Sequence, residues 1–87
     1  MGDLTETVKP IVPSLDQTLI HFTATKVAQN DTITFGDYRL VVWAAAFVDA
    51  GSDWLADTVT RTDGTANQIK LTGASTGSIY GIALVTR

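Results

Sequence analysis

Two stretches of this chain are apolar on both faces of an extended strand: residues 40–48 (LVVWAAAFV) and residues 79–85 (IYGIALV). Because a strand points alternate side chains to opposite faces, a strand with one solvated face normally alternates apolar and polar residues. In a small domain of two layers, only one face of each strand can meet the domain's own core. The other face therefore predicts a contact with a second molecule, for which another copy of the chain is the simplest candidate.

Alternation divides the first stretch into two sets that are equally apolar. One set holds Val41, Trp43, Ala45 and Phe47, and the other holds Leu40, Val42, Ala46 and Val48. Since a shift of one residue exchanges the two faces, the sequence leaves open which set points outward.

Composition limits the class of protein. The 87 residues form one small domain, and without cysteine the chain has neither disulfides nor a thiolate metal site. Only 17% of the residues are charged, against about 25% in an ordinary soluble domain, which favours a surface partly covered by partners. A net charge of −3 with dispersed lysines and arginines argues against nucleic acid as a partner.

The chain shows no targeting segment in its first residues and no membrane span. Residues 1–6 are acidic and lack the apolar core of a secretory signal. The longest apolar run is about half the length of a membrane-spanning helix. We therefore expect synthesis in the cytoplasm and no membrane partner.

The pattern of strands and turns predicts an all-β fold, a single small antiparallel β-sandwich or barrel of six to seven strands with an extended N-terminal arm. The arm covers residues 1–14 and the sandwich or barrel covers residues 15–87. The expected strands are residues 17–27, 32–35, 40–48, 58–62, 68–72 and 78–86, with a short edge strand over residues 5–9 as the seventh. A helix is the alternative for residues 40–48, and Ser52 is expected to cap a single helical turn through Ala56.

The N-terminal arm contains both prolines of the chain, which fix φ and favour extended backbone. We expect the arm to lie on a neighbouring subunit, and a frayed terminus is the alternative. The residues expected in this contact are Val8, Pro10, Ile11, Val12 and Pro13.

No catalytic arrangement and no cofactor site is evident. The single histidine, His21, has no partner at a spacing typical of metal binding or acid–base catalysis, so we expect a structural or surface role. Asp49, Asp53 and Asp57 flank a glycine-bearing loop, but they lack the ligand spacing of an EF-hand. Solvated carboxylates are expected there, and calcium binding is left open.

Four aromatic residues could form a sugar-stacking platform on a small β-sandwich: Trp43, Trp54, Tyr38 and Tyr80. Trp54 follows Gly51, Ser52 and Asp53 in an expected loop and is the best candidate for an exposed ring. A small carbohydrate-binding module is therefore one alternative function.

Three segments carry a resemblance to a known group of proteins. They are the Thr32-Ile33-Thr34-Phe35 strand, the segment from Asn67 to Gly73, and the segment from Ser78 to Leu84. Together they make residues 17–87 resemble the small β-rich structural proteins of bacterial and archaeal viruses. That resemblance implies a virion component, such as a capsid decoration or cement protein, that forms symmetric oligomers and has no catalytic residues.

The sequence thus predicts a non-enzymatic virion structural protein that self-assembles as a homo-oligomer and contacts a major capsid protein or other virion component. The expected anchors of the oligomer interface are Val42, Trp43, Phe47, Ile82 and Leu84. A second alternative is a subunit of an extracellular filament, assembled by strand donation from the N-terminal arm.

Overall fold

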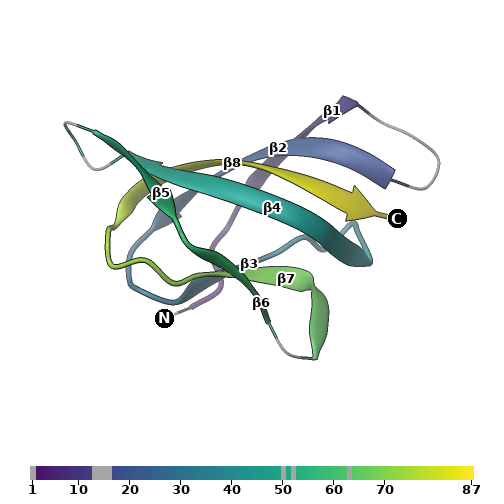
Figure 1. The fold of residues 1–87 in the computed structure, drawn as a ribbon. Helices are drawn as coiled ribbons and strands as arrows, with labels where there is room; N and C mark the ends of the chain where they lie inside the picture. The colour runs from purple at the N-terminus through teal and green to yellow at the C-terminus, as the bar shows by residue number, and fades with distance from the viewer. Residues whose placement is uncertain (1, 13–16, 50, 52, 63) are drawn as a thin grey trace.

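The computed structural model describes residues 2–12, 17–49, 51, 53–62 and 64–87, and this part of the chain contains eight strands and no helix. They form two antiparallel sheets, drawn as the upper and lower layers of Figure 1. The strands are β1 (Thr7–Val12), β2 (Gln17–Lys26), β3 (Asp31–Thr34), β4 (Leu40–Asp49), β5 (Trp54–Asp57), β6 (Val59–Thr62), β7 (Thr65–Leu71) and β8 (Gly77–Thr86).

The five-stranded sheet has the order β1-β2-β8-β4-β5, and the three-stranded sheet has the order β3-β7-β6. The chain passes directly from β5 in the first sheet to β6 in the second, with only Thr58 between them. The all-β class is confirmed, and the two-layer arrangement fits a sandwich (Figure 1).

The core lies between the inner faces of the two sheets. Phe22 and Phe35 meet there edge to face, with ring centroids 5.2 Å apart. Gly81 is needed beside them, because a Cβ at this position would collide with the Phe22 ring and with the carbonyl oxygen of Ala45. The largest apolar residues sealed in this core are Ile20, Phe22, Ile33, Phe35, Val48, Ile69, Leu71, Ile79 and Val85.

Most of the predicted strands are present, and their ends differ from the prediction by three residues or fewer. Residues 40–49 form a strand, so the helical alternative for this stretch is wrong. The helical turn predicted through Ala56 is also wrong, because Trp54–Asp57 is strand β5, paired with Ala46–Asp49. Ladder hydrogen bonds with β4 satisfy more backbone groups there than one helical turn would. With β5 added, the described residues hold eight strands where six to seven were predicted.

Strict alternation fails at one point in β4. The pairing of β4 with β8 shifts register between Val41 and Trp43. Such an irregularity opposes two residues to one and resets which side chains face the core. Val41 is therefore buried with Ala46 and Val48, and the prediction that it shares a face with Trp43 is wrong.

The N-terminal residues contact both sheets of their own chain. Residues 2–4 run parallel to β3, where Leu4 N–H donates to the Thr32 carbonyl and Thr32 N–H donates to the Gly2 carbonyl. Strand β1 then pairs with β2 at the edge of the five-stranded sheet, with Pro10 opposite Ile20. Pro13 and the proposed boundary after residue 14 lie outside the described residues.

Candidate functional site

The outer face of the five-stranded sheet is apolar over β4 and β8, and no described segment of the chain lies over it. Trp43, Phe47 and Tyr80 are 51%, 49% and 44% exposed, and Ile82 is 37% exposed. The strand neighbours of Phe47, Tyr80 and Ile82 are buried, which establishes that these three side chains point away from the core. Trp43 is paired with Leu84, two residues along β8 from Ile82, and so lies on the same face. We call this surface the outer apolar face; its members are Leu19, Trp43, Ala45, Phe47, Tyr80, Ile82 and Leu84.

Strand register joins these residues into one surface across β2, β8 and β4. Trp43 is opposite Leu84, and Phe47 is opposite Tyr80. Leu84 in turn is opposite Leu19 on β2. Directly opposed side chains on one face are about 5 Å apart and touch. Three half-exposed aromatic residues and an isoleucine leave on the order of 400 Å² of apolar area accessible, the size of surface patch that often marks an interaction site.

A shallow hollow of about 250 Å³ lies within this face. The small side chain of Ala45 leaves space there, the backbone of Gly81 forms part of the lining, and the larger Phe47, Tyr80 and Ile82 stand around it. His21 completes the lining from β2, so the single histidine lies on this surface, half-buried. The hollow has room for an aromatic side chain, since a closed cavity of about 150 Å³ already holds benzene.

The rim of the face carries two further apolar residues. Trp54 is opposite Asp49, and is 76% exposed. Val42 lies at the register shift of β4 and is 40% exposed. The five residues predicted as interface anchors are thus all on this face or at its rim, and whether they contact a second copy stays a prediction. Tyr80 and Ala45 were not among them, although each lies two residues from a predicted anchor on the same strand, Tyr80 from Ile82 and Ala45 from Trp43 and Phe47.

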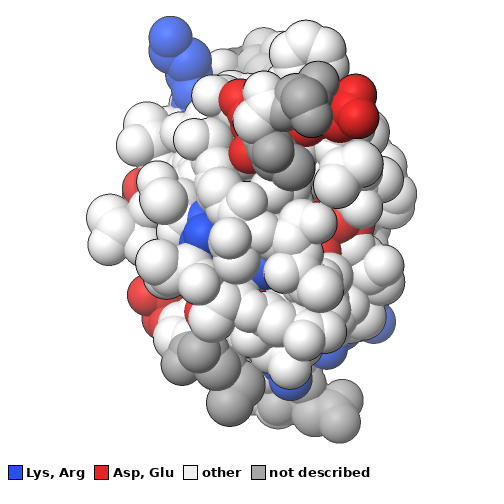
Figure 2. Space-filling view, turned by 90° about the vertical axis from the view of Figure 1, so that its left-hand side faces the viewer, with Lys and Arg blue, Asp and Glu red and all other residues white. Residues whose placement is uncertain are grey.

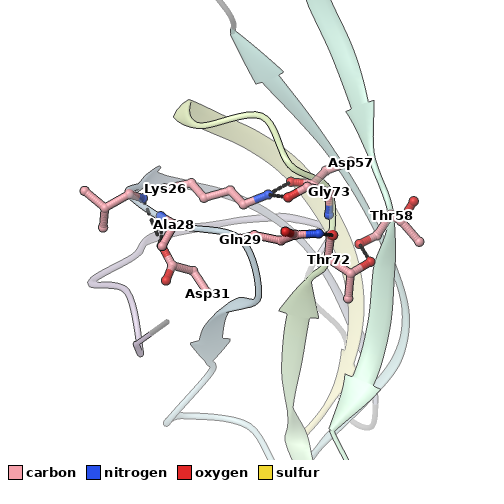
Figure 3. Close-up of polar contacts among 9 residues, drawn as sticks. Lys26, Ala28, Gln29, Asp31, Asp57, Thr58, Thr72 and Gly73 are labelled. Atoms are coloured by element: carbon pink, nitrogen blue, oxygen red, sulfur yellow. Dashed lines mark hydrogen bonds and ion pairs between the residues drawn. The ribbon is translucent and has the colours of Figure 1, made fainter.

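A buried ion pair lies at the crossover between the sheets. Lys26 Nζ is 2.6 Å from Asp57 Oδ2, and both side chains are sealed from solvent, at 0% and 1% exposure. The same ammonium donates to the Gly73 carbonyl at 2.7 Å, and Gly73 N–H donates to Asp57 Oδ1 at 2.8 Å (Figure 3). Glycine is required at position 73, because a Cβ there would lie 2.6 Å from Asp57 Oδ1. This arrangement holds the end of β2, the end of β5 and the segment after β7 together.

Asp31 is a second buried carboxylate, and three backbone N–H groups donate to it. Val27 N–H and Ala28 N–H donate to Oδ2 at 2.9 Å, and Gly2 N–H donates to Oδ1 at 3.0 Å. Burial raises the pKa of the Asp31 carboxyl, but the hydrogen bonds from Ala28, Val27 and Gly2, together with the positive charge of the N-terminus, outweigh burial and lower the pKa below its ordinary value. Asp31 therefore fixes the turn before β3 and ties residue 2 to it.

Asp49, Asp53 and Asp57 do not form a cation site in the described structure. Asp57 is committed to Lys26, Asp49 Oδ1 accepts from Gly51 N–H, and Asp53 is exposed. No group of three or more acidic or histidine side chains among the described residues is placed to hold a metal ion. Charged side chains are also sparse on the face shown in Figure 2, where they form no large patch of one sign.

Tyr38 is buried in the core, so it does not belong to the sugar-stacking platform that the sequence suggested. The other three aromatic residues of that prediction, Trp43, Trp54 and Tyr80, are exposed. No helix within the described residues is long and apolar enough to cross a membrane.

Comparison of the chain with protein-family models, with curated proteins and with solved structures finds no match.

Proposed function

We propose that this protein is a non-enzymatic structural subunit that assembles as a homo-oligomer by covering its outer apolar face. The observation that carries the proposal is that Trp43, Phe47, Tyr80 and Ile82 form one exposed apolar surface on a folded sheet. Burying about 400 Å² on each of two copies would contribute about 20 kcal/mol at 25 cal/mol per Å². That gross gain exceeds the cost of association, which is about 4–15 kcal/mol.

The narrower proposal is a virion component, such as a capsid decoration or cement protein. It is supported by the resemblance of residues 17–87 to small β-rich virion proteins and by the low content of charged residues. In this setting the oligomer is made in the host cytoplasm and binds a major capsid protein or another virion component.

The test is the oligomeric state of Ile82→Asp compared with Thr60→Asp. Ile82 lies inside the outer apolar face, whereas Thr60 is exposed on β6 of the other sheet. We expect the unchanged protein and Thr60→Asp to be oligomers in light scattering after size exclusion. We expect Ile82→Asp to be a folded monomer, because a carboxylate buried at an interface without a partner is strongly unfavourable.

Thermal unfolding of the two variants is the control for folding. An unchanged protein that stays monomeric at millimolar concentration would contradict the proposal, and so would an Ile82→Asp variant that assembles normally.

A carbohydrate-binding module is the second candidate, supported by the exposure of Trp43, Trp54 and Tyr80 on or beside one face. Glycan-array binding by the Ile82→Asp monomer, lost on further substitution Trp54→Ala, would favour this function over assembly.

A filament subunit is the third candidate. Here β1 lies in its own chain's sheet, so strand donation requires β1 to leave β2 and pair with the next subunit. Deletion of residues 1–13 would then abolish polymer growth and leave the remaining domain folded.

A further inference from the structure

The outer apolar face has a shape that can receive a copy of itself. Phe47 projects from it with 49% of its surface exposed, and the hollow lined by Ala45 and Gly81 lies directly beside Phe47. A projecting ring and a hollow that can hold a ring therefore occur side by side on one surface. A two-fold axis passing between them would place the ring of each copy in the hollow of the other, as in any isologous contact.

The electrostatics of the face also suit a second copy. An isologous contact brings residues near their own equivalents, so a charged centre would repel itself. The members of the outer apolar face include no aspartate, glutamate, lysine or arginine. His21 lines the hollow from β2, and Lys9 and Asp49 lie only at the margins, paired in register with His21 and Trp54. The face therefore carries no carboxylate, ammonium or guanidinium group to oppose self-contact or to select a charged partner.

The accessible area is close to what a stable dimer needs. A standard interface buries about 800 Å² on each partner, of which about 450–520 Å² is apolar. The outer apolar face supplies on the order of 400 Å² of this from four residues alone.

We infer that two copies pack outer face to outer face, with the Phe47 ring of each copy seated in the Ala45–Gly81 hollow of the other. Two five-stranded sheets would then stack about 10 Å apart with their strands about 30° from parallel, as sheets do in sandwiches. This inference rests on the proposed homo-oligomer and specifies that the outer apolar face of one copy meets that of the other, and how the side chains interlock.

The decisive variant is Ala45→Phe, which fills the hollow with an apolar ring. If the hollow receives the partner's Phe47, this variant displaces two buried rings, one from each copy, and weakens association by about 10²–10⁴-fold. If the face were merely adhesive, an added exposed ring would strengthen association instead. Leu19→Phe is the matched control, because it adds a ring to the same face outside the hollow and should leave the dissociation constant within about threefold.

The exchange variant Ala45→Phe with Phe47→Ala supplies the second test. It moves the ring to position 45 and the space to position 47 in both copies, so the interlocking contact can form again. We expect its dissociation constant, measured by analytical ultracentrifugation, to recover at least tenfold of the loss seen in Ala45→Phe, a difference of about 1.4 kcal/mol.

Disulfide cross-linking tests the same contact by a route that does not depend on how well the Ala45→Phe variants fold. The chain has no cysteine, so a mixture of Ala45→Cys and Phe47→Cys proteins can form a disulfide only between the new thiols. We expect the mixed dimer to form faster under mild oxidation than either homodimer, because position 45 of one copy faces position 47 of the other.

The outcomes separate this inference from the proposed function. An oligomer that tightens or does not change with Ala45→Phe overturns the face-to-face arrangement and leaves self-assembly standing. An unchanged protein that is monomeric at all concentrations overturns both.

Discussion

The outer faces of the two sheets are built differently. On the three-stranded sheet, Thr32 is opposite Lys70 and Thr34 is opposite Gln68. Gln68 Nε2 donates to Thr34 Oγ1 at 2.9 Å, and Thr34 Oγ1 donates to Asp3 at 3.0 Å, so this face is polar and its groups are bonded. On the five-stranded sheet, the equivalent outward positions of β4 and β8 hold Trp43, Phe47, Tyr80 and Ile82.

The difference shows that the outer face of the three-stranded sheet is suited to contact with water, whereas the outer apolar face of the five-stranded sheet is not. Both sheets have apolar residues on their inner faces, so the shared core does not account for the difference between the two outer faces. A polar outer face needs no partner, whereas contiguous exposed apolar residues mark a surface that is covered in the working state. The apolar outward positions of β4 and β8 are therefore the feature on which the proposed assembly rests.

The largest expected effect comes from breaking the link between the two sheets with Lys26→Met. It would leave the buried Asp57 carboxylate without its cation, and loss of one partner of a buried ion pair costs about 3–5 kcal/mol. Urea unfolding should show this loss. The double variant Lys26→Met with Asp57→Leu should recover most of it, and equal stability of single and double variants would contradict the role given to the pair.

A smaller effect should follow from making the outer apolar face resemble the polar one with Trp43→Thr. Threonine keeps strand propensity but removes the apolar area, so association should weaken by about 10–100-fold. Monomer stability should change little, because half of the Trp43 surface is already exposed. Sedimentation equilibrium measures the first quantity and thermal unfolding of dilute protein the second; a large loss of monomer stability would show that Trp43 belongs to the core.

The smallest expected effect is a loss of stability at low pH that arises from Asp31, the first residue of β3 at the edge of the three-stranded sheet. The folded pKa of Asp31 lies below 3.8, so its stabilisation is present above the unfolded pKa and is lost as pH falls through the folded value. Each unit of separation between the two pKa values is worth about 1.4 kcal/mol. The free energy of unfolding, measured with urea at values from about pH 6 to about pH 2, should fall in the unchanged protein as the Asp31 carboxylate is protonated. In Asp31→Asn the same profile should be flatter.

Local sequence patterns were sufficient for most of the fold. Alternation and turn residues located the long strands, and Asn30 has the positive φ of 69° that its turn required. The β5 strand was missed, because Trp54–Asp57 has no alternation of its own and is a strand only by pairing with β4. Lys26 was missed as a buried residue, although its alternation with Ile20 and Phe22 on β2 places it on the inner face.

The sequence by itself determined that residues 40–48 and 79–85 would carry apolar side chains on both faces, since period-two geometry follows from the backbone. Only the tertiary structure decided which side chains face outward. The register shift at Val41 and Trp43 resets the alternation in β4, and strand order then places β8 between β2 and β4. Contacts such as Lys26 with Asp57, 31 residues apart, form only once β2 and β5 have been brought together in the five-stranded sheet.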